Sequence, residues 1–179
     1  MSIFATMIQT EKPIAALFDL DGVIFDTEPQ YSIFWGSECA RFRPDIPGLA
    51  SAFKGQTLKF IFDNYFTDPE VQQILVKELN EFEANMNYEY VAGAEQFIQE
   101  LRSNGVKVAV VTSSDKNKMD SVKRAHPELE QLFDRILTAE LFSASKPNPD
   151  CYLLGARVFD APLQNCMVFE DSFNGLKAG

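Results

Sequence analysis

Residues 18–27 read FDLDGVIFDT, and this stretch decides the fold of the chain. It follows residues 13–17, an apolar run bounded by proline that is typical of a short buried strand. The strand brings two carboxylates, Asp19 and Asp21, to its carboxyl end, where a glycine permits a tight turn. Alternate residues of a strand point to opposite faces, so the two carboxylates converge on one spot only if the strand ends near Leu20.

Two adjacent acids can perform covalent chemistry. One carboxylate can attack a phosphoryl or carbon centre, and the second can handle the proton of the leaving group. Because unpaired acids repel each other, we expect a cation nearby. Taken alone, the pattern DxDG is also typical of an ordinary turn or of part of a calcium-binding loop. The stretch by itself leaves both interpretations open.

Three further stretches follow the first in a defined order. An apolar run at 108–111 ends in Thr112, Ser113 and Ser114; the loop SKPNPD at 145–150 carries Lys146; and an apolar run at 167–169 ends in Glu170 and Asp171. In this order, the aspartates, hydroxyls, lysine and acid pair resemble the four motifs of the haloacid dehalogenase superfamily over nearly the whole chain. Within it, the chain resembles the branch of small phosphatases and β-phosphoglucomutases that carry a helical cap.

Composition limits the class of protein. The 179 residues suit one compact domain, or one domain with a modest insertion. A net charge of −10 argues against a nucleic-acid partner. Three cysteines without paired spacing indicate a reduced, cytoplasmic location. No apolar run reaches transmembrane length, and residues 1–10 lack the features of a signal peptide, so we expect a loose N-terminal extension and no membrane partner. We also expect a monomer.

The order of periodic segments predicts an α/β fold. Apolar residues recur at helical spacing through 28–88, which predicts helices with one apolar face each. From about residue 89 onward, strands and helices alternate, which predicts parallel βαβ units and a Rossmann-like parallel sheet. The strands are expected at 14–19, 106–112, 135–138 and 166–170, and the helices between them at 94–104, 115–125 and 149–159. The family that the chain resembles inserts its cap at residues 28–88, and the resemblance therefore implies a discontinuous core domain, 1–27 and 89–179, with an inserted helical cap domain, 28–88.

The resemblance also implies the arrangement of the sheet. The strand that carries Asp19 is expected at the centre, between the strand of Thr112 and the strand of Asp171. Ligands of open parallel sheets bind at the carboxyl ends of such strands, where the winding reverses. The family continues beyond Gly179 into one more strand and helix, so we expect the C-terminal edge of the sheet to be incomplete.

The resemblance assigns the catalytic roles. Asp19 is expected to be the nucleophile that forms an aspartyl-phosphate, and Asp21 the general acid and base. Thr112 is expected to hydrogen-bond a phosphoryl oxygen, and Lys146 to neutralise the negative charge there. Two structural alternatives remain open: a hydroxyl after a strand is often only a helix cap, and a loop lysine is often only a solvated charge.

The resemblance implies one cofactor, Mg²⁺. Its expected ligands are Asp19, Asp21 through its backbone carbonyl, Glu170 and Asp171, and an all-oxygen site with retained waters suits this ion. The alternative for Glu170 and Asp171 is a helix N-terminus, where acids are favoured in any case.

The substrate is expected to be a small phosphorylated metabolite, with sugar phosphates among the candidates. True dehalogenases of the superfamily lack the second aspartate and the metal, so Asp21 argues against dehalogenation. The β-phosphoglucomutases have a histidine where this chain has Tyr31 and an arginine where it has Leu58, although Lys54 lies nearby. We therefore favour a phosphatase and keep a sugar phosphate mutase as the alternative. The expected substrate-binding residues are Thr27, Tyr31, Lys54, Gly55 and Ser113, with Thr27 also readable as a hinge or helix cap.

A non-enzymatic class must also be weighed. A receiver module likewise presents acids and a lysine around a phosphorylatable aspartate on a parallel sheet. It has neither a DxD pair nor a helical insertion, and residues 28–88 therefore discriminate against it. The only histidine, His126, lies at the end of a polar helix and is not expected to be catalytic.

Overall fold

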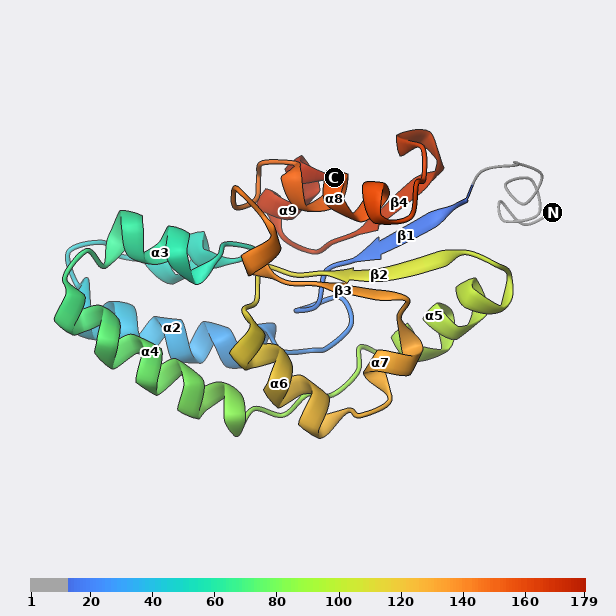
Figure 1. Cartoon of the computed structure of the whole chain (residues 1–179). Coiled ribbons are helices and arrows are strands. Elements are labelled where there is room, and N and C mark those ends of the chain that lie inside the picture. Colours follow the sequence, from blue (N-terminus) through green and yellow to red (C-terminus); the bar gives the residue numbers. More distant parts are fainter. Residues whose placement is uncertain (1–12) are drawn as a thin grey trace.

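The computed structural model describes residues 13–179, and within them four strands form one parallel sheet in the order β3-β2-β1-β4 (Figure 1). The strands are β1 Ala15–Phe18, β2 Lys107–Val111, β3 Arg135–Leu137 and β4 Cys166–Phe169. β1 lies between β2 and β4, with Ala15 opposite both Lys107 and Cys166. The predicted central position of this strand is confirmed, whereas the predicted N-terminal extension lies outside the described residues.

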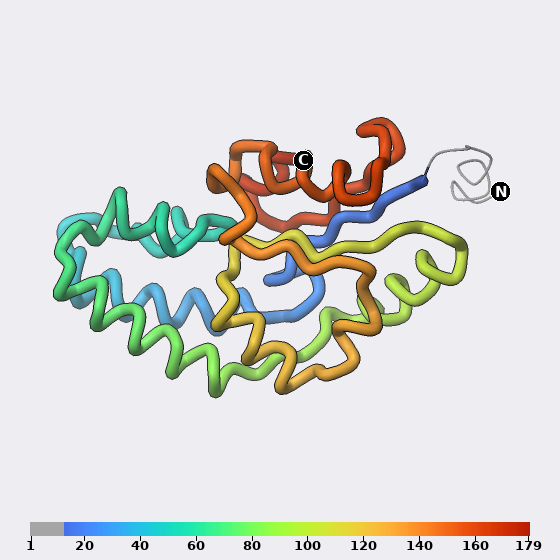
Figure 2. The backbone as a smooth tube through the Cα atoms, viewed as in Figure 1, coloured from blue at the N-terminus to red at the C-terminus, as the bar shows by residue number. Residues whose placement is uncertain are grey.

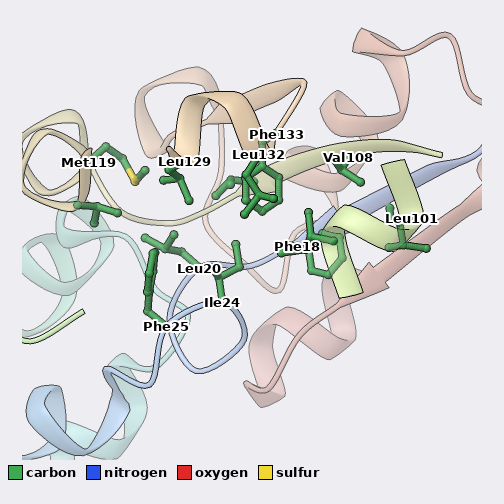
Figure 3. Packing of buried hydrophobic residues seen from close by; sticks show 14 of the residues in the cluster. Phe18, Leu20, Ile24, Phe25, Leu101, Val108, Met119, Leu129, Leu132 and Phe133 are labelled. Atoms are coloured by element: carbon green, nitrogen blue, oxygen red, sulfur yellow. The ribbon is translucent and has the colours of Figure 1, made fainter. Parts of the chain in front are cut away.

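Helices cover both faces of the sheet, because alternate strand residues point to opposite sides. Phe18, Val108 and Val110 pack on the face covered by α5 Ala94–Ser103, α6 Lys116–Ala125 and α7 Leu129–Leu132. Leu17 and Val111 pack on the opposite face, which is covered by α8 Asp150–Val158 and α9 Phe173–Ala178. Figure 3 shows side chains from β1, from the turn after it and from α5, α6 and α7 packed together in the first of these clusters. The predicted α/β sheet fold is thus confirmed.

Residues 28–88, called the helical segment below, leave the sheet after β1 and return to it before α5 (Figure 2). They form α2 Glu28–Phe42, the 3₁₀ helix η1 Leu49–Phe53, α3 Leu58–Tyr65 and α4 Pro69–Ala84. The side chains of Thr57 and Asp68 cap α3 and α4 by accepting backbone hydrogen bonds. The segment has an apolar cluster of its own, in which Trp35, Phe53 and Leu75 are buried.

Two details differ from the sequence-based expectation. β1 ends at Phe18, so Asp19 follows the strand instead of closing it. The short helix α7 and the 3₁₀ helices η2 Ala139–Leu141 and η3 Leu163–Asn165 were not predicted, because segments of three or four residues carry no measurable periodicity. β4 forms one edge of the sheet within residues 13–179, and all four of its residues are half-buried. Within residues 13–179, no helix combines the length and apolar character needed to cross a membrane.

Candidate active site

The turn after β1 brings Asp19 and Asp21 to the same cavity. The backbone N–H of Asp19 donates to the carbonyl of Phe169 at 2.9 Å, which keeps this residue tied to β4. The chain then turns at Leu20 and at Gly22, whose φ of +73° favours glycine. Both aspartates line one cavity as a result. We expected the carboxylates of Asp19 and Asp21 to converge only if the strand ended near Leu20. The strand does end there, and the two carboxylates converge.

A buried ion-pair network lies behind Asp19. Lys146, which is 1% exposed, donates from Nζ to Oδ1 of Asp19 at 2.9 Å and also to Oε1 of Glu170. The other oxygen of Glu170 accepts hydrogen bonds from the backbone and the hydroxyl of Ser172, at 2.8 and 2.9 Å. Lys146 is consequently not a solvated loop charge, because burying an ammonium group is favourable only when it is paired and hydrogen-bonded.

The protonation of this network depends on burial and on Lys146. Burial raises the pKa of Asp19 to about 7, since desolvation and repulsion by Glu170 and Asp21 outweigh the attraction of Lys146. Burial acts in the same direction on Glu170, but the ion pair with Lys146 holds its pKa below the ordinary value. Despite desolvation, the carboxylates raise the pKa of Lys146 well above its usual range, so the lysine is charged. An additional cation beside Asp19 would favour its ionised form.

Asp21 is held by three side chains from two other parts of the chain. Its Oδ1 accepts from the hydroxyl of Thr27 at 2.5 Å, and its Oδ2 accepts from the hydroxyl of Ser114 at 3.2 Å and from Nζ of Lys118. Lys118 is 2% exposed. Sequence reasoning missed Lys118 and the contact of Ser114, because a lysine in a polar helix is expected to face solvent. Thr27 lies behind Asp21, outside the cavity wall, and its side chain makes no helix-capping hydrogen bond.

The segment that follows β2, the strand next to β1, contributes Thr112 and Ser113. Both line the cavity, and Thr112 is 1% exposed. The cap of the following helix is Asp115, whose side chain accepts from the backbone of Lys118 at 3.0 Å, so the helix-cap alternative for Thr112 is wrong. The hydroxyl of Ser113 donates to the carbonyl of Gly55 at 2.9 Å and thereby joins the core to the helical segment.

The acids at the strand ends form a cluster with the geometry of a cation site. Asp19, Glu170 and Asp171 each place one carboxylate oxygen within 4.8 Å of the others. The carboxylate of Asp21 is turned toward its own three partners, so of this residue only the backbone carbonyl is left for the site that the resemblance implies. Three carboxylates whose oxygens lie this close together, one of them with a raised pKa, fit a hard divalent cation such as Mg²⁺. The N-cap of α9 is Ser172, which leaves both acids of the predicted pair outside that helix.

The helical segment supplies the opposite wall of the site. The hydroxyl of Tyr31 donates to Oε1 of Glu83 at 2.6 Å, and Nζ of Lys118 lies 4.5 Å from the centre of the Tyr31 ring. Burial raises the pKa of Glu83 to about 7, although Lys118 and Tyr31 oppose the shift. Lys54 pairs with Asp171 at 2.8 Å and with Glu28 at 3.2 Å.

The cavity between these walls has a volume of about 680 Å³, which is in the range of small-molecule sites. Of the residues predicted to bind substrate, it is lined by Tyr31, Lys54, Gly55 and Ser113. His126 lies elsewhere: it caps the end of α6, and its ring contacts the carbonyl of Tyr88 and packs against Phe25. This agrees with the expectation that it has no catalytic role.

Comparison with known proteins gives relatives of similar sequence and fold. The chain is 28% identical to the protein SUPPRESSOR OF QUENCHING 1, chloroplastic, of Arabidopsis thaliana, over 93% of this chain but only 17% of that protein. It is 31% identical to hexitol phosphatase A of Escherichia coli, over 91% of this chain and 76% of that protein. The crystal structure of β-phosphoglucomutase from Clostridium difficile superposes with a TM-score of 0.70 at 26% identity, covering 93% of this chain and 79% of the other.

A family profile described as "Hydrolase: haloacid dehalogenase-like hydrolase" matches residues 15–179. This range includes all four stretches from which the resemblance was inferred, from Asp19 to Asp171. The match confirms both the resemblance and the prediction of an enzyme. The chain belongs to the haloacid dehalogenase-like hydrolases.

Proposed function

We propose that the chain is a Mg²⁺-dependent phosphomonoester hydrolase that acts on small phosphorylated metabolites through an aspartyl-phosphate. The observation that carries this proposal is the convergence of Asp19, Asp21 and Thr112 on one cavity, with the buried Lys146 bonded to Asp19. A nucleophile, a proton-transferring acid, a phosphate-binding hydroxyl and a fixed positive charge are the groups that phosphoryl transfer requires.

The first step forms a bond from a carboxylate oxygen of Asp19 to phosphorus and breaks the bond from phosphorus to the alcohol oxygen. Lys146 and the hydroxyl of Thr112 stabilise the charge on the phosphoryl oxygens, and Asp21 gives its proton to the leaving alcohol. In the second step water attacks the aspartyl-phosphate and Asp21 accepts a proton from it. Inorganic phosphate leaves, and Asp19 and Asp21 return to their starting states.

The acidic cluster suits the cation of this proposal. Asp19, Glu170 and Asp171 would hold Mg²⁺, which supplies positive charge that offsets the repulsion between these acids and the anionic substrate. The chain itself orients the cluster: Lys146 and Ser172 hold Glu170, and Lys54 holds Asp171. At Gly22 a side chain would collide with Asp171, so the turn and the cluster require a glycine there.

We also propose that the helical segment is a cap domain over a core of 1–27 and 89–179. The cavity is lined from both parts, and Ser113 and Ser145 of the core contact Gly55 and Thr57 of the segment. The connections to the core lie near Thr27 and near residue 91, where loops can absorb a hinge rotation. Closure over the site would limit access of bulk water to the aspartyl-phosphate.

The pairing of the lysine side chains that line the cavity favours hydrolysis over a mutase reaction. Among the described residues, Lys54 and Lys118 are the basic side chains that line the cavity, and each is paired with a carboxylate of the site. A mutase must hold a second phosphate at the same time as the aspartyl-phosphate, which requires a free positive charge. The relatives include proteins named hexitol phosphatase and β-phosphoglucomutase, so both activities are tested below.

The proposal is tested by phosphate release from the purified chain in Mg²⁺. We expect repeated turnover of acetyl phosphate and of several alkyl phosphates, with a mass increase of one phosphoryl group on the protein after rapid quenching. Failure to hydrolyse acetyl phosphate and every alkyl phosphate, with no phosphorylated protein, would contradict the proposal. Interconversion of glucose 1-phosphate and glucose 6-phosphate without net phosphate release would instead establish the mutase alternative. A cytoplasmic location and a monomeric state stay predictions from the sequence.

Replacing Lys118→Met is expected to lower kcat/KM for an alkyl phosphate by about 10²-fold, since general acid–base groups contribute about 10²–10⁴-fold. Lys118 acts here as a positioning residue for Asp21. Acetyl phosphate releases acetate, which needs no proton, so its kcat/KM should fall far less. The matched control is Lys116→Met, because Lys116 is exposed on the same helix. Equal losses for the alkyl phosphate and for acetyl phosphate would show that Lys118 has only a structural role.

A further inference from the structure

The cavity has two ends of different chemistry. Its core end is lined by Asp19, Asp21 and Asp171 of the proposed reaction. The end inside the helical segment is lined by apolar side chains from all four of its helices: Trp35, Ala50, Phe53, Leu58, Ile61 and Leu79. Trp35, Phe53 and Ile61 are also part of the buried cluster of that segment, so the cavity reaches its apolar interior. The part of a substrate beyond the phosphate would therefore face mostly carbon.

Most polar side chains of the helical segment that line the cavity are already engaged. Tyr31 donates to Glu83, Lys54 is bound to Asp171, and the hydroxyl of Ser51 donates to the carbonyl of Gly48 at 2.8 Å. Ser32 lines the cavity from an exposed position on α2. The segment consequently offers few free partners for a polar substrate.

One buried acceptor is an exception. Gln56 lines the cavity, and its Oε1 is buried without a hydrogen-bond partner among the described residues. The flanking residues Gly55 and Thr57 both contact the core, which places Gln56 at the boundary between the two ends. A single acceptor can satisfy one donor of a ligand, whereas a sugar phosphate would bring several hydroxyl groups that need partners.

From these observations we infer that the preferred substrates are phosphate monoesters of alcohols with a largely apolar ring, in place of polyhydroxylated sugar phosphates. The inference rests on the proposed phosphatase activity and names its substrate class. The ring would occupy the end of the cavity between Trp35, Phe53 and Ile61, while the phosphate meets Asp19 at the other end. Most hydroxyl groups of a sugar would lose water there without gaining a hydrogen bond in exchange.

The test compares cyclohexylmethyl phosphate with glucose 6-phosphate. Both carry a six-membered ring on a primary phosphate ester, so the reacting bonds are alike and the hydroxyl groups are the main difference. We expect kcat/KM to be about 100-fold higher for the cyclohexylmethyl ester, a ratio typical of discrimination by a single well-matched pocket. Equal values, or a preference for glucose 6-phosphate, would overturn the inference while the phosphatase activity stood. Absence of turnover with both of these and with acetyl phosphate would instead contradict the proposed function.

A substitution in the apolar end of the cavity tests whether this end causes the expected preference for an apolar ring. Ala50→Phe fills the apolar end from η1, and Ala52→Phe makes the same change at an exposed position of that helix outside the lining. With Ala50→Phe, the ratio of kcat/KM for cyclohexylmethyl phosphate to that for acetyl phosphate should fall at least about 10-fold. Ala52→Phe should leave the ratio unchanged, and circular dichroism checks that both variants fold. An unchanged ratio in folded Ala50→Phe would overturn the assignment of this end of the cavity to the substrate ring.

Discussion

Replacing Asp19→Asn is expected to lower kcat for every phosphate ester by at least about 10³-fold, because loss of a covalent nucleophile removes the reaction path itself. The amide keeps the size of the side chain, and Lys146 retains Glu170 as a buried partner. We therefore expect the variant to fold, as circular dichroism and thermal unfolding would show. The phosphorylated protein that is expected after rapid quenching of the wild type should be absent.

The control for this variant is a substitution within the same stretch, residues 18–27. Asp26→Asn makes an identical change at an exposed position outside the cavity, and it should leave kcat near the wild-type value. If Asp19→Asn kept near wild-type turnover, or if the phosphoryl group were found on another residue, the assignment of the nucleophile would be wrong. A loss of the same size in Asp26→Asn would show that general damage to the turn explains the effect.

Removal of divalent cations is expected to lower turnover to background, and added Mg²⁺ should restore it. Asp19, Glu170 and Asp171 concentrate negative charge where an anionic phosphate must bind, and their two lysine partners, Lys146 and Lys54, leave the site net negative. Without a cation the raised pKa of Asp19, about 7, also means that much of this carboxylate is protonated near neutrality. The measurement is phosphate release after dialysis against EDTA, with Mg²⁺-saturated EDTA as the control.

A direct measurement of Mg²⁺ binding tests the metal site independently of catalysis. Calorimetric titration of the substrate-free chain with Mg²⁺ should show one site, and Asp171→Asn should weaken it because one of its oxygen ligands loses its charge. Asp26→Asn should bind Mg²⁺ like the wild type, since its side chain lies outside the acidic cluster. Undiminished turnover in excess EDTA, or Mg²⁺ binding that is insensitive to Asp171→Asn, would contradict the proposed metal site.

Much of the fold was predictable from local patterns in the sequence. The apolar run before Asp19 and the polar residues that follow β2 and β4 indicated a parallel sheet with its functional groups at the carboxyl ends of the strands. Figure 1 shows β1 directed toward the part of the molecule that contains α2, α3 and α4. Pro and Asp at the start of α4, and Asn104 and Gly105 after α5, marked helix ends within a residue or two. These features are local, because caps and periodicity depend on residues a few positions apart.

The partners of the site residues were decided by tertiary structure alone. Lys118 reaches Asp21 across 97 positions of sequence, and nothing in the polar helix around it distinguishes it from the exposed Lys116. The raised pKa of Asp19 likewise arises from burial and from Glu170, which no local pattern reports.

The existence and shape of the cavity could not be predicted from the sequence either. The spacing of Trp35, Phe53 and Ile61 indicates helix faces that pack together, but it does not tell whether they pack against each other or leave space between them. Local structure follows from neighbouring residues, whereas burial, charge pairing and cavity shape arise only when distant elements meet and water is excluded between them.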